Sequence, residues 1–321
     1  MLPPLSEMEQ AARTVYATMP ATPQYCWPLL CERLGAEVWA KHENHTPIGA
    51  FKVRGGLVYF AALNEGDAKP AGVISATRGN HGQSVGLAAR RYGIAATIVV
   101  PHGNSVEKNA AMRALGVELI EHGDDFQASL EHAERLARER SLHLVPSYHR
   151  LLVAGVATCW IELLRAVPDL HTVYVPIGLG SGISGLLAAR NAFGYRTQVV
   201  GVVSAHARAY LESFLQKKAV DSPVSTRLAD GMACRSPHPD ALEVIWQGVD
   251  RIIAVTDAEV AEAIRTLFAC THNVSEGAGA AGLAAAMQER SRNLGRKIAI
   301  TVSGGNIDSE VFARVLTGSS A

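Results

Sequence analysis

One lysine stands in an apolar stretch of the segment HENHTPIGAFKVRGG, residues 42–56. A turn at residues 46–49 precedes Lys52, whose near neighbours in the chain are Ala50, Phe51, Val53 and Leu57. Apolar surroundings disfavour the charged form of an amine and lower its pKa. A neutral lysine amine is the nucleophile that Schiff-base chemistry requires. The alternative is a surface lysine that lays its hydrocarbon stem along apolar side chains.

A glycine-rich segment, GLGSGISG at residues 178–185, lies between a predicted strand and a predicted helix. Glycines let the chain curl so that several backbone N–H groups point at one anion, with the helix dipole behind them. Gly180, Gly182 and Gly185 also fit the dinucleotide pattern G-x-G-x-x-G, but that pattern needs an acidic residue after the next strand. The sequence VVSAH at 202–206 has none. We therefore favour a single phosphate over a dinucleotide, and over a tight turn without a ligand.

Two further loops follow predicted strands. Residues 77–83 (TRGNHGQ) supply short polar side chains and free backbone amides at a helix N-terminus, which suits a carboxylate. The alternative for this loop is ordinary N-capping. Ser303 follows an apolar strand that ends at Val302, and a hydroxyl at such a place points into the crevice where α/β proteins bind ligands. Taken alone, Ser303 is better explained as a cap of the last helix.

The elements that position these loops alternate between short apolar runs and amphipathic stretches. Apolar strands separated by helices of this length predict parallel sheets that are covered on both faces. The chain of 321 residues therefore forms one large α/β domain or two intertwined lobes. The connection at 216–239 is long enough to predict a functional loop. We expect strands at 73–75, 96–100, 117–120, 143–145, 173–177, 197–203, 251–255 and 297–302, and helices at 83–92, 106–115, 124–140, 151–165, 184–193, 258–270 and 308–316.

Composition excludes several classes of protein. Lys+Arg and Asp+Glu both number 30, so the balance gives no support for binding to nucleic acid or to an anionic membrane. No apolar run reaches the ~18 residues of a membrane span, and the N-terminus has no secretory signal pattern. Five scattered cysteines without a C-x-x-C pair fit reduced thiols in a cytoplasmic protein. We expect Cys159 and Cys270 to pack in the core.

Taken together, the loops around Lys52, Asn80, Gly180 and Ser303 resemble those of the fold-type II pyridoxal-phosphate enzymes, and among them the threonine/serine dehydratases. The resemblance extends from about Thr22 to the last helix. It implies an α/β fold like that of the tryptophan synthase β subunit, with two lobes. Each lobe has a mainly parallel twisted sheet with helices on both faces. It also implies a large cofactor-binding domain, residues 1–54 and 148–321, and a small mobile domain, residues 55–147, which carries the Asn80 loop and closes over substrate.

The same resemblance assigns roles to residues of this chain. Lys52, after Phe51, carries pyridoxal 5'-phosphate and acts as the base. Asn80 meets the ring hydroxyl, and Ser303 faces the ring nitrogen. The phosphate-binding residues are Gly178, Leu179, Gly180, Ser181 and Gly182. The substrate carboxylate binds to Thr77, Arg78, Gly79, Asn80 and His81.

The activity that the resemblance implies is dehydration and deamination of a β-hydroxy amino acid, such as L-threonine or L-serine, to a 2-oxo acid and ammonia. Where related serine racemases have a serine base, this chain has Arg78. A guanidinium does not accept a proton, so we expect little racemisation. Many dehydratases have serine at the position of Ala50. We expect no metal site, because the acidic ligands of some relatives are absent near 203–209. The missing C-terminal regulatory extension implies a catabolic enzyme.

Three alternatives stay open at this point. The motifs are most similar to those of hydroxyectoine-utilisation and phenylserine dehydratases, so the substrate is open among threonine, serine, 3-hydroxyaspartate, phenylserine and a hydroxyectoine-derived amino acid. Cysteine synthases, which catalyse β-replacement, share the fold and the loops. A non-catalytic sensor of a phosphate ligand is the alternative outside enzymes. The resemblance also implies a homodimer acting on a small-molecule amino acid.

Overall fold

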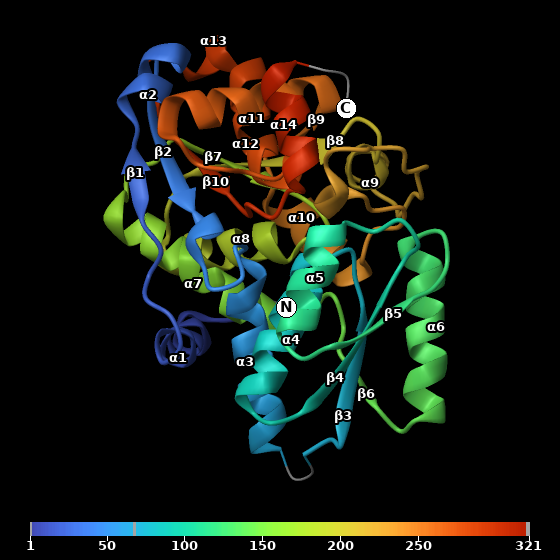
Figure 1. Ribbon diagram of the computed structural model, residues 1–321. Coiled ribbons are helices and arrows are strands. Elements are labelled where there is room, and N and C mark those ends of the chain that lie inside the picture. Colours follow the sequence, from blue (N-terminus) through green and yellow to red (C-terminus); the bar gives the residue numbers. More distant parts are fainter. Residues whose placement is uncertain (1, 67–68, 319–321) are drawn as a thin grey trace.

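The computed structural model describes residues 2–66 and 69–318 and contains two separate sheets (Figure 1). In the larger sheet the edge strand β1 is antiparallel to β2, and all other neighbours are parallel. In the smaller sheet every pair is parallel. The larger sheet has the order β1 (Gln24–Cys26), β2 (Glu37–His42), β10 (Lys297–Val302), β7 (Thr172–Pro176), β8 (Gln198–Ser204), β9 (Arg251–Val255). The smaller has the order β5 (Glu118–Glu121), β4 (Ala95–Val100), β3 (Gly72–Ala76), β6 (His143–Leu144).

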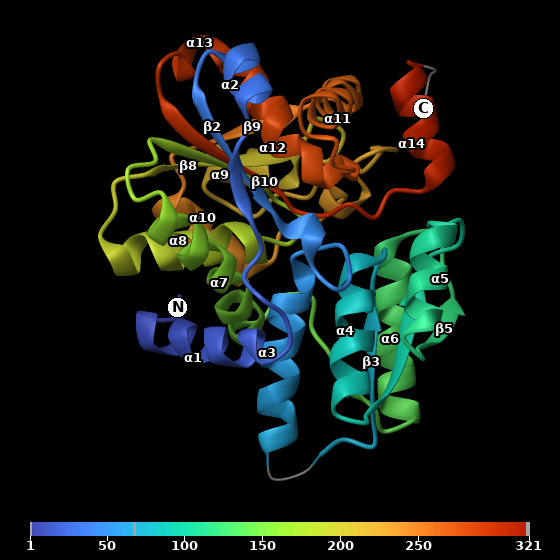
Figure 2. The ribbon, with the colours of Figure 1, turned by 60° about the vertical axis from the view of Figure 1, so that its left-hand side comes forward.

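The six-stranded lobe, built on the larger sheet, has helices on both faces (Figure 2). Its strands are apolar on both sides: Val173 and Val175 point into one core cluster and Tyr174, between them, points into the other. This alternation is the strand period of two. The first cluster contains residues of α1 (Leu5–Tyr16), α7 (Arg150–Ala166), α8 (Ser181–Phe193), α9 (Ala209–Gln216) and α10 (Pro239–Gly248). The second contains residues of α2 (Pro28–Leu34), α11 (Asp257–Thr271), α12 (Gly277–Gln288) and α14 (Ser309–Thr317), and the short α13 (Arg290–Asn293) follows α12.

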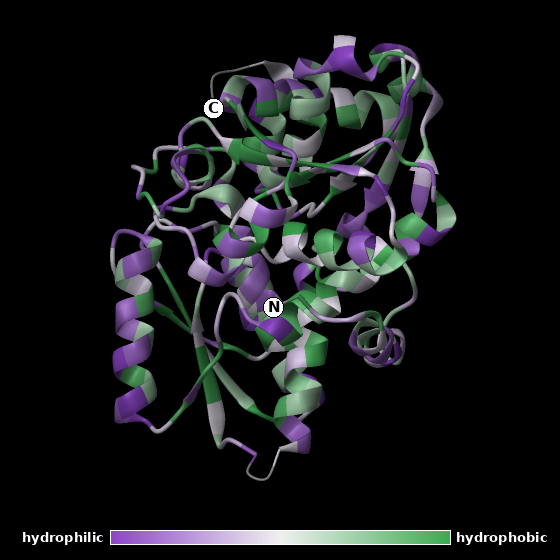
Figure 3. Ribbon diagram, turned by 180° about the vertical axis from the view of Figure 1, so that it is seen from behind, coloured by the Kyte–Doolittle hydropathy of each residue, from purple (hydrophilic) through white to green (hydrophobic). Residues whose placement is uncertain are grey.

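The four-stranded lobe, built on the smaller sheet, also has helices packed on both faces of its sheet. Val73 packs with residues of α4 (Asn80–Arg91) and α5 (Val106–Ala114), whereas Ile74 packs with α6 (Phe126–Glu139) on the other face. Figure 3 shows hydrophobic strands inside this lobe and hydrophilic segments along its outer helix. Helix α3 (Lys52–Glu65) packs against both α4 and α7, so it connects the two lobes.

The predicted fold class is confirmed: there are two mainly parallel sheets, each with helices on both faces. Helices α4 and α8 begin three residues earlier than predicted, at Asn80 and Ser181 rather than at residues 83 and 184. The polar and glycine residues that directly follow Gly79 and Gly180 thus form the first helical turns, and those two glycines, with positive φ, end the loops. Helix α3 runs through residue 54, and the domain division at 54 and 147 stays a prediction.

Two smaller expectations concern the cysteines and the long connection. Cys159 is buried in the core of the six-stranded lobe, and Cys270 packs at its edge. The five cysteines are free thiols. The connection between α9 and α10 contains only a short 3-10 turn, η2 (Asp230–Met232). Of the helices in the described part of the chain, none combines the length and the apolar character needed to cross a bilayer.

Candidate active site

A cavity of about 490 Å³ lies where the loops after three parallel strands meet. Thr77 follows β3, Gly178 lies just beyond the end of β7, and Ser303 follows β10. The carboxyl ends of parallel strands are where open α/β sheets bind ligands. The predicted site residues that line this cavity are Phe51, Lys52, Thr77, Arg78, Gly79, Asn80, His81, Gly178, Leu179 and Ser303. Gly180, Ser181 and Gly182 are not among the lining residues and belong to the start of α8.

Lys52 is the first residue of α3, and its amine lies close to the glycine segment. Its Nζ donates to Ser181 Oγ at 3.3 Å and lies 5.0 Å from the centre of the Phe51 ring. Burial lowers the pKa of Lys52 to about 8, although the negative charge of Glu276 acts in the opposite direction. The lowered pKa that the sequence predicts is therefore confirmed. The Phe51 N–H donates to the Ser303 carbonyl at 3.0 Å, which ties the lysine loop to the serine loop.

The glycine segment forms a turn that side chains would obstruct. Gly180 has φ +98°, a left-handed conformation that favours glycine. A Cβ on Gly178 would lie 2.4 Å from the carbonyl oxygen of Gly231. The first bond within α8 runs from Ser184 N–H to Gly180 C=O, so the preceding N–H groups have no partner inside the helix. A tight turn that ends in free helical N–H groups fits a phosphate.

The loop at residues 77–81 is held by its own side chains. Thr77 Oγ1 accepts from the Gly79 N–H at 3.0 Å, and Gly79 has φ +148°. Asn80 donates through Nδ2 to Glu276 Oε1 at 2.6 Å and accepts from Asn306 at 2.8 Å. His81 is buried, its Nε2 has no partner among the described residues, and burial lowers its pKa to about 3. A neutral imidazole therefore lines the cavity.

Ser303 is nearly buried and lines the cavity. Within the described residues its hydroxyl has no hydrogen-bond partner. Such a hydroxyl fits a neutral heterocyclic nitrogen. The lysine, the glycine turn and this hydroxyl together match the aldehyde, phosphate and ring nitrogen of pyridoxal phosphate. The same part of the chain contains no group of three or more His, Cys, Asp or Glu side chains that could hold a metal ion.

The cavity wall contains a buried cluster of charged side chains that the sequence analysis does not predict. Glu276, at the N-terminus of α12, has its Oε2 3.0 Å from Lys108 Nζ, and Lys108 is also 2.7 Å from Asp230 Oδ2. The two carboxylates raise the pKa of Lys108 despite its burial, whereas burial raises the pKa of Glu276. Lys108 and Asn80 come from the four-stranded lobe and the two carboxylates from the six-stranded lobe. The cluster therefore joins the lobes beside Lys52.

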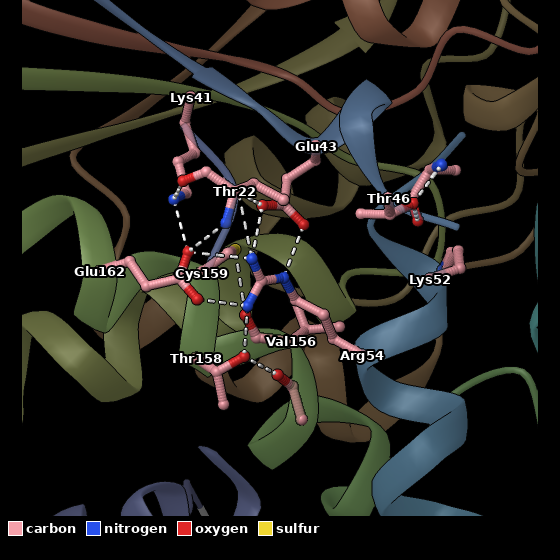
Figure 4. A network of polar contacts seen from close by, with 12 residues as sticks. Thr22, Lys41, Glu43, Thr46, Lys52, Arg54, Val156, Thr158, Cys159 and Glu162 are labelled. Carbon is pink, nitrogen blue, oxygen red and sulfur yellow. Dashed lines mark hydrogen bonds and ion pairs between the residues drawn. The ribbon is translucent and has the colours of Figure 1, made fainter. Parts of the chain in front are cut away.

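A second buried network fixes the first turn of α3. Figure 4 shows the Arg54 guanidinium between the carboxylates of Glu43 and Glu162. Arg54 Nε lies 2.7 Å from Glu43 Oε2, and its Nη1 lies 2.6 Å from Glu162 Oε1. Arg54 and Glu43 are fully buried, and Lys41 Nζ adds a contact of 2.5 Å to Glu162. Because Arg54 follows Lys52 by two residues, this network anchors the helix that carries the lysine.

Comparisons with known proteins agree with this site. The family model "Pyridoxal-phosphate dependent enzyme" matches residues 18–304. An L-threonine ammonia-lyase of Thermotoga maritima is 34% identical over 97% of this chain and 78% of that protein. The catabolic L-threonine dehydratase TdcB of Staphylococcus aureus is 31% identical over 95% of this chain and 89% of its own length. The crystal structure of a threonine deaminase from T.th. has a TM-score of 0.88 and 32% identity over 95% of this chain and 99% of that one.

The matched region contains all the loops that form the cavity. The chain therefore belongs to the pyridoxal-phosphate-dependent enzymes, in the fold-type II branch that includes the threonine dehydratases.

Proposed function

We propose that the protein catalyses the α,β-elimination of water from a β-hydroxy amino acid such as L-threonine or L-serine, which yields a 2-oxo acid and ammonia. The observation that carries the proposal is the position of Lys52. Its amine, with a pKa near 8, lies in one cavity with the glycine turn, Asn80 and Ser303. Relatives across nearly the whole chain are named threonine ammonia-lyase and threonine dehydratase.

The residues that would hold pyridoxal phosphate are Lys52, the turn at 178–182, Asn80 and Ser303. When bound, the cofactor withdraws electrons from the Cα–H bond of an attached amino acid. Lys52 then takes the Cα proton, since a buried amine with a pKa near the operating pH is an effective general base. Ser303 offers a hydroxyl rather than a carboxylate, so it does not stabilise a positive charge on the ring nitrogen. A hydroxyl at this position therefore favours loss of the β-hydroxyl over return of the proton to Cα.

The loop at residues 77–81 would bind the substrate carboxylate. The free N–H groups at the start of α4 and the positive end of its dipole favour an anion there. Arg78 occupies the position in this loop at which related serine racemases carry a second base, the group that would deliver a proton to the opposite face of Cα. Because a guanidinium stays protonated, we expect slow racemisation.

The test is a panel of β-hydroxy amino acids with both diastereomers at Cβ, scored by release of ammonia and of a 2-oxo acid. We expect turnover of L-threonine or L-serine without any added nucleophile. Consumption of serine only when sulfide is present would favour β-replacement instead. A colourless protein that releases no pyridoxal phosphate on denaturation would favour a non-catalytic sensor.

We also propose that the protein is a cytoplasmic homodimer. Light scattering of the purified protein, which gives its molar mass in solution, tests the dimer. Residues 55–147 are proposed to move as a small domain over bound substrate. If they do, substrate should protect this part of the chain from limited proteolysis. Equal cleavage with and without substrate would contradict the movement.

A further inference from the structure

Arg78 brings a permanent charge to the cavity and has nothing to pair with. Its side chain is partly buried and lines the cavity. Throughout residues 2–66 and 69–318 no group forms a hydrogen bond or an ion pair with it. Because the side chain is only partly buried, water in the cavity solvates the guanidinium when no ligand is present. A ligand with a negative charge that enters the cavity would take the place of this water and form charge-assisted hydrogen bonds with the guanidinium.

The other fixed cations of the cavity already have carboxylate partners. Lys108 pairs with Asp230 and Glu276. Arg235 lies 3.5 Å from Asp125, and both side chains are more than half exposed. Among the described residues, the cavity thus holds one guanidinium whose charge is left for a ligand.

We infer that Arg78 binds a second carboxylate, carried by the substrate at Cβ, so that the substrate class is the β-hydroxy amino diacids, with 3-hydroxyaspartate as the probe. This inference rests on the proposed function. A planar guanidinium accepts a carboxylate through two parallel hydrogen bonds. The α-carboxylate has a separate place, since the N–H groups at the start of α4 precede the first helical bond, from Gln83 N–H to Gly79 C=O.

The reaction with such a substrate is the same elimination. The Cα proton goes to Lys52, and the Cβ–O bond breaks with its electron pair on the leaving oxygen. This oxygen takes up one proton, the equivalent of the proton that Lys52 accepts, and departs as water. Hydrolysis of the released enamine returns one water, so 3-hydroxyaspartate gives oxaloacetate and ammonia. The exposed carboxylates Asp124 and Asp125 also line the cavity. Solvent screens exposed charges, so their repulsion of a second carboxylate is weak.

The experiment compares kcat/KM for both diastereomers of L-3-hydroxyaspartate with kcat/KM for L-threonine, in the wild type, Arg78→Gln and Arg78→Lys. For Arg78→Gln we expect the preference for one hydroxyaspartate diastereomer over threonine to fall on the order of 10- to 100-fold, because a charge-assisted carboxylate contact is lost. Arg78→Lys should restore part of it. Arg235→Gln removes the other guanidinium of the cavity and should leave the preference within about threefold of wild type.

A second readout is independent of turnover. By calorimetry, succinate should bind the wild-type holoenzyme more tightly than butyrate, and Arg78→Gln should remove the difference. An equal loss of threonine and hydroxyaspartate turnover in Arg78→Gln would assign Arg78 to the α-carboxylate and overturn the inference, as would a wild type that turns over threonine but not hydroxyaspartate. If no β-hydroxy amino acid releases ammonia, the proposed function fails, and the calorimetry still decides whether Arg78 binds a second carboxylate.

Discussion

Replacing Arg54 with methionine removes the cation that holds a fully buried carboxylate. Glu43 pairs with Arg54 alone among the described cations, and its other hydrogen bond comes from Thr22 Oγ1 at 2.5 Å. Glu162 keeps Lys41 at 2.5 Å, so the loss falls mainly on Glu43. Removing one partner of a buried ion pair costs about 3–5 kcal/mol, because the remaining charge stays in a medium of low polarity. We therefore expect Arg54→Met to lower the free energy of unfolding by about 3–5 kcal/mol.

The assay is equilibrium unfolding in urea, followed by circular dichroism and tryptophan fluorescence. The double variant Arg54→Met/Glu43→Gln leaves no unpaired charge at Glu43 and should be more stable than the single variant by about 2 kcal/mol or more. The matched control is Arg33→Met, which breaks the pair of Arg33 with Glu262. Those side chains are 49% and 40% exposed, so the cost should stay below about 1 kcal/mol. An Arg54→Met midpoint equal to that of Arg33→Met would refute this reasoning.

Three further predictions concern the cavity. Gly178→Ala places a methyl group 2.4 Å from a backbone carbonyl oxygen and should weaken cofactor binding at least about tenfold, measured by equilibrium dialysis of pyridoxal phosphate. Gly66→Ala, at the far end of α3 and outside the cavity, has a Cβ that would meet only ordinary contacts of 3.6–3.8 Å and should leave the affinity within about threefold. Lys108→Met removes the ammonium that two carboxylates of the six-stranded lobe share, and it should increase proteolysis of the four-stranded lobe; unchanged cleavage would contradict its role between the lobes. Burial lowers the pKa of Lys52 to about 8, and only the neutral amine is a base. Because kcat reports the substrate complex, in which the lysine amine is free, kcat should fall about tenfold per pH unit below that value. A flat acid limb in a pH–rate profile would rule out this amine as the titrating base.

The sequence indicated where the chemistry lies because parallel strands end at one edge of a sheet. Thr77, Gly178 and Ser303 each follow an apolar strand, so alternation of strands and helices sufficed to predict that their loops meet. The lowered pKa of Lys52 could be predicted from its apolar neighbours in the chain. The start of α8 was misplaced by three residues because a Gly-Ser-Gly stretch favours a loop by local propensity, whereas here its backbone opens the helix.

The charged networks could not be predicted in the same way. Glu276 follows Asn80 by 196 residues, and Arg54 meets Glu162 at a separation of 108 residues. No spacing or motif in one sequence identifies such partners, because they are brought together only when the sheets and α3 pack. A buried Lys108 beside a polar loop gives no local signal either. The lack of a partner for Arg78 likewise depends on where the packed lobes put its described neighbours, which its own sequence neighbours do not indicate.

We propose that the amine of Lys52 is the group that bonds to the cofactor aldehyde. The direct measurement is reduction of the purified holoprotein with borohydride, which fixes a C=N bond as a stable amine, followed by proteolysis and mass spectrometry. We expect a pyridoxyl phosphate adduct on the peptide that contains Lys52, and none in Lys52→Ala. An adduct on another lysine, or an unchanged adduct in Lys52→Ala, would contradict it.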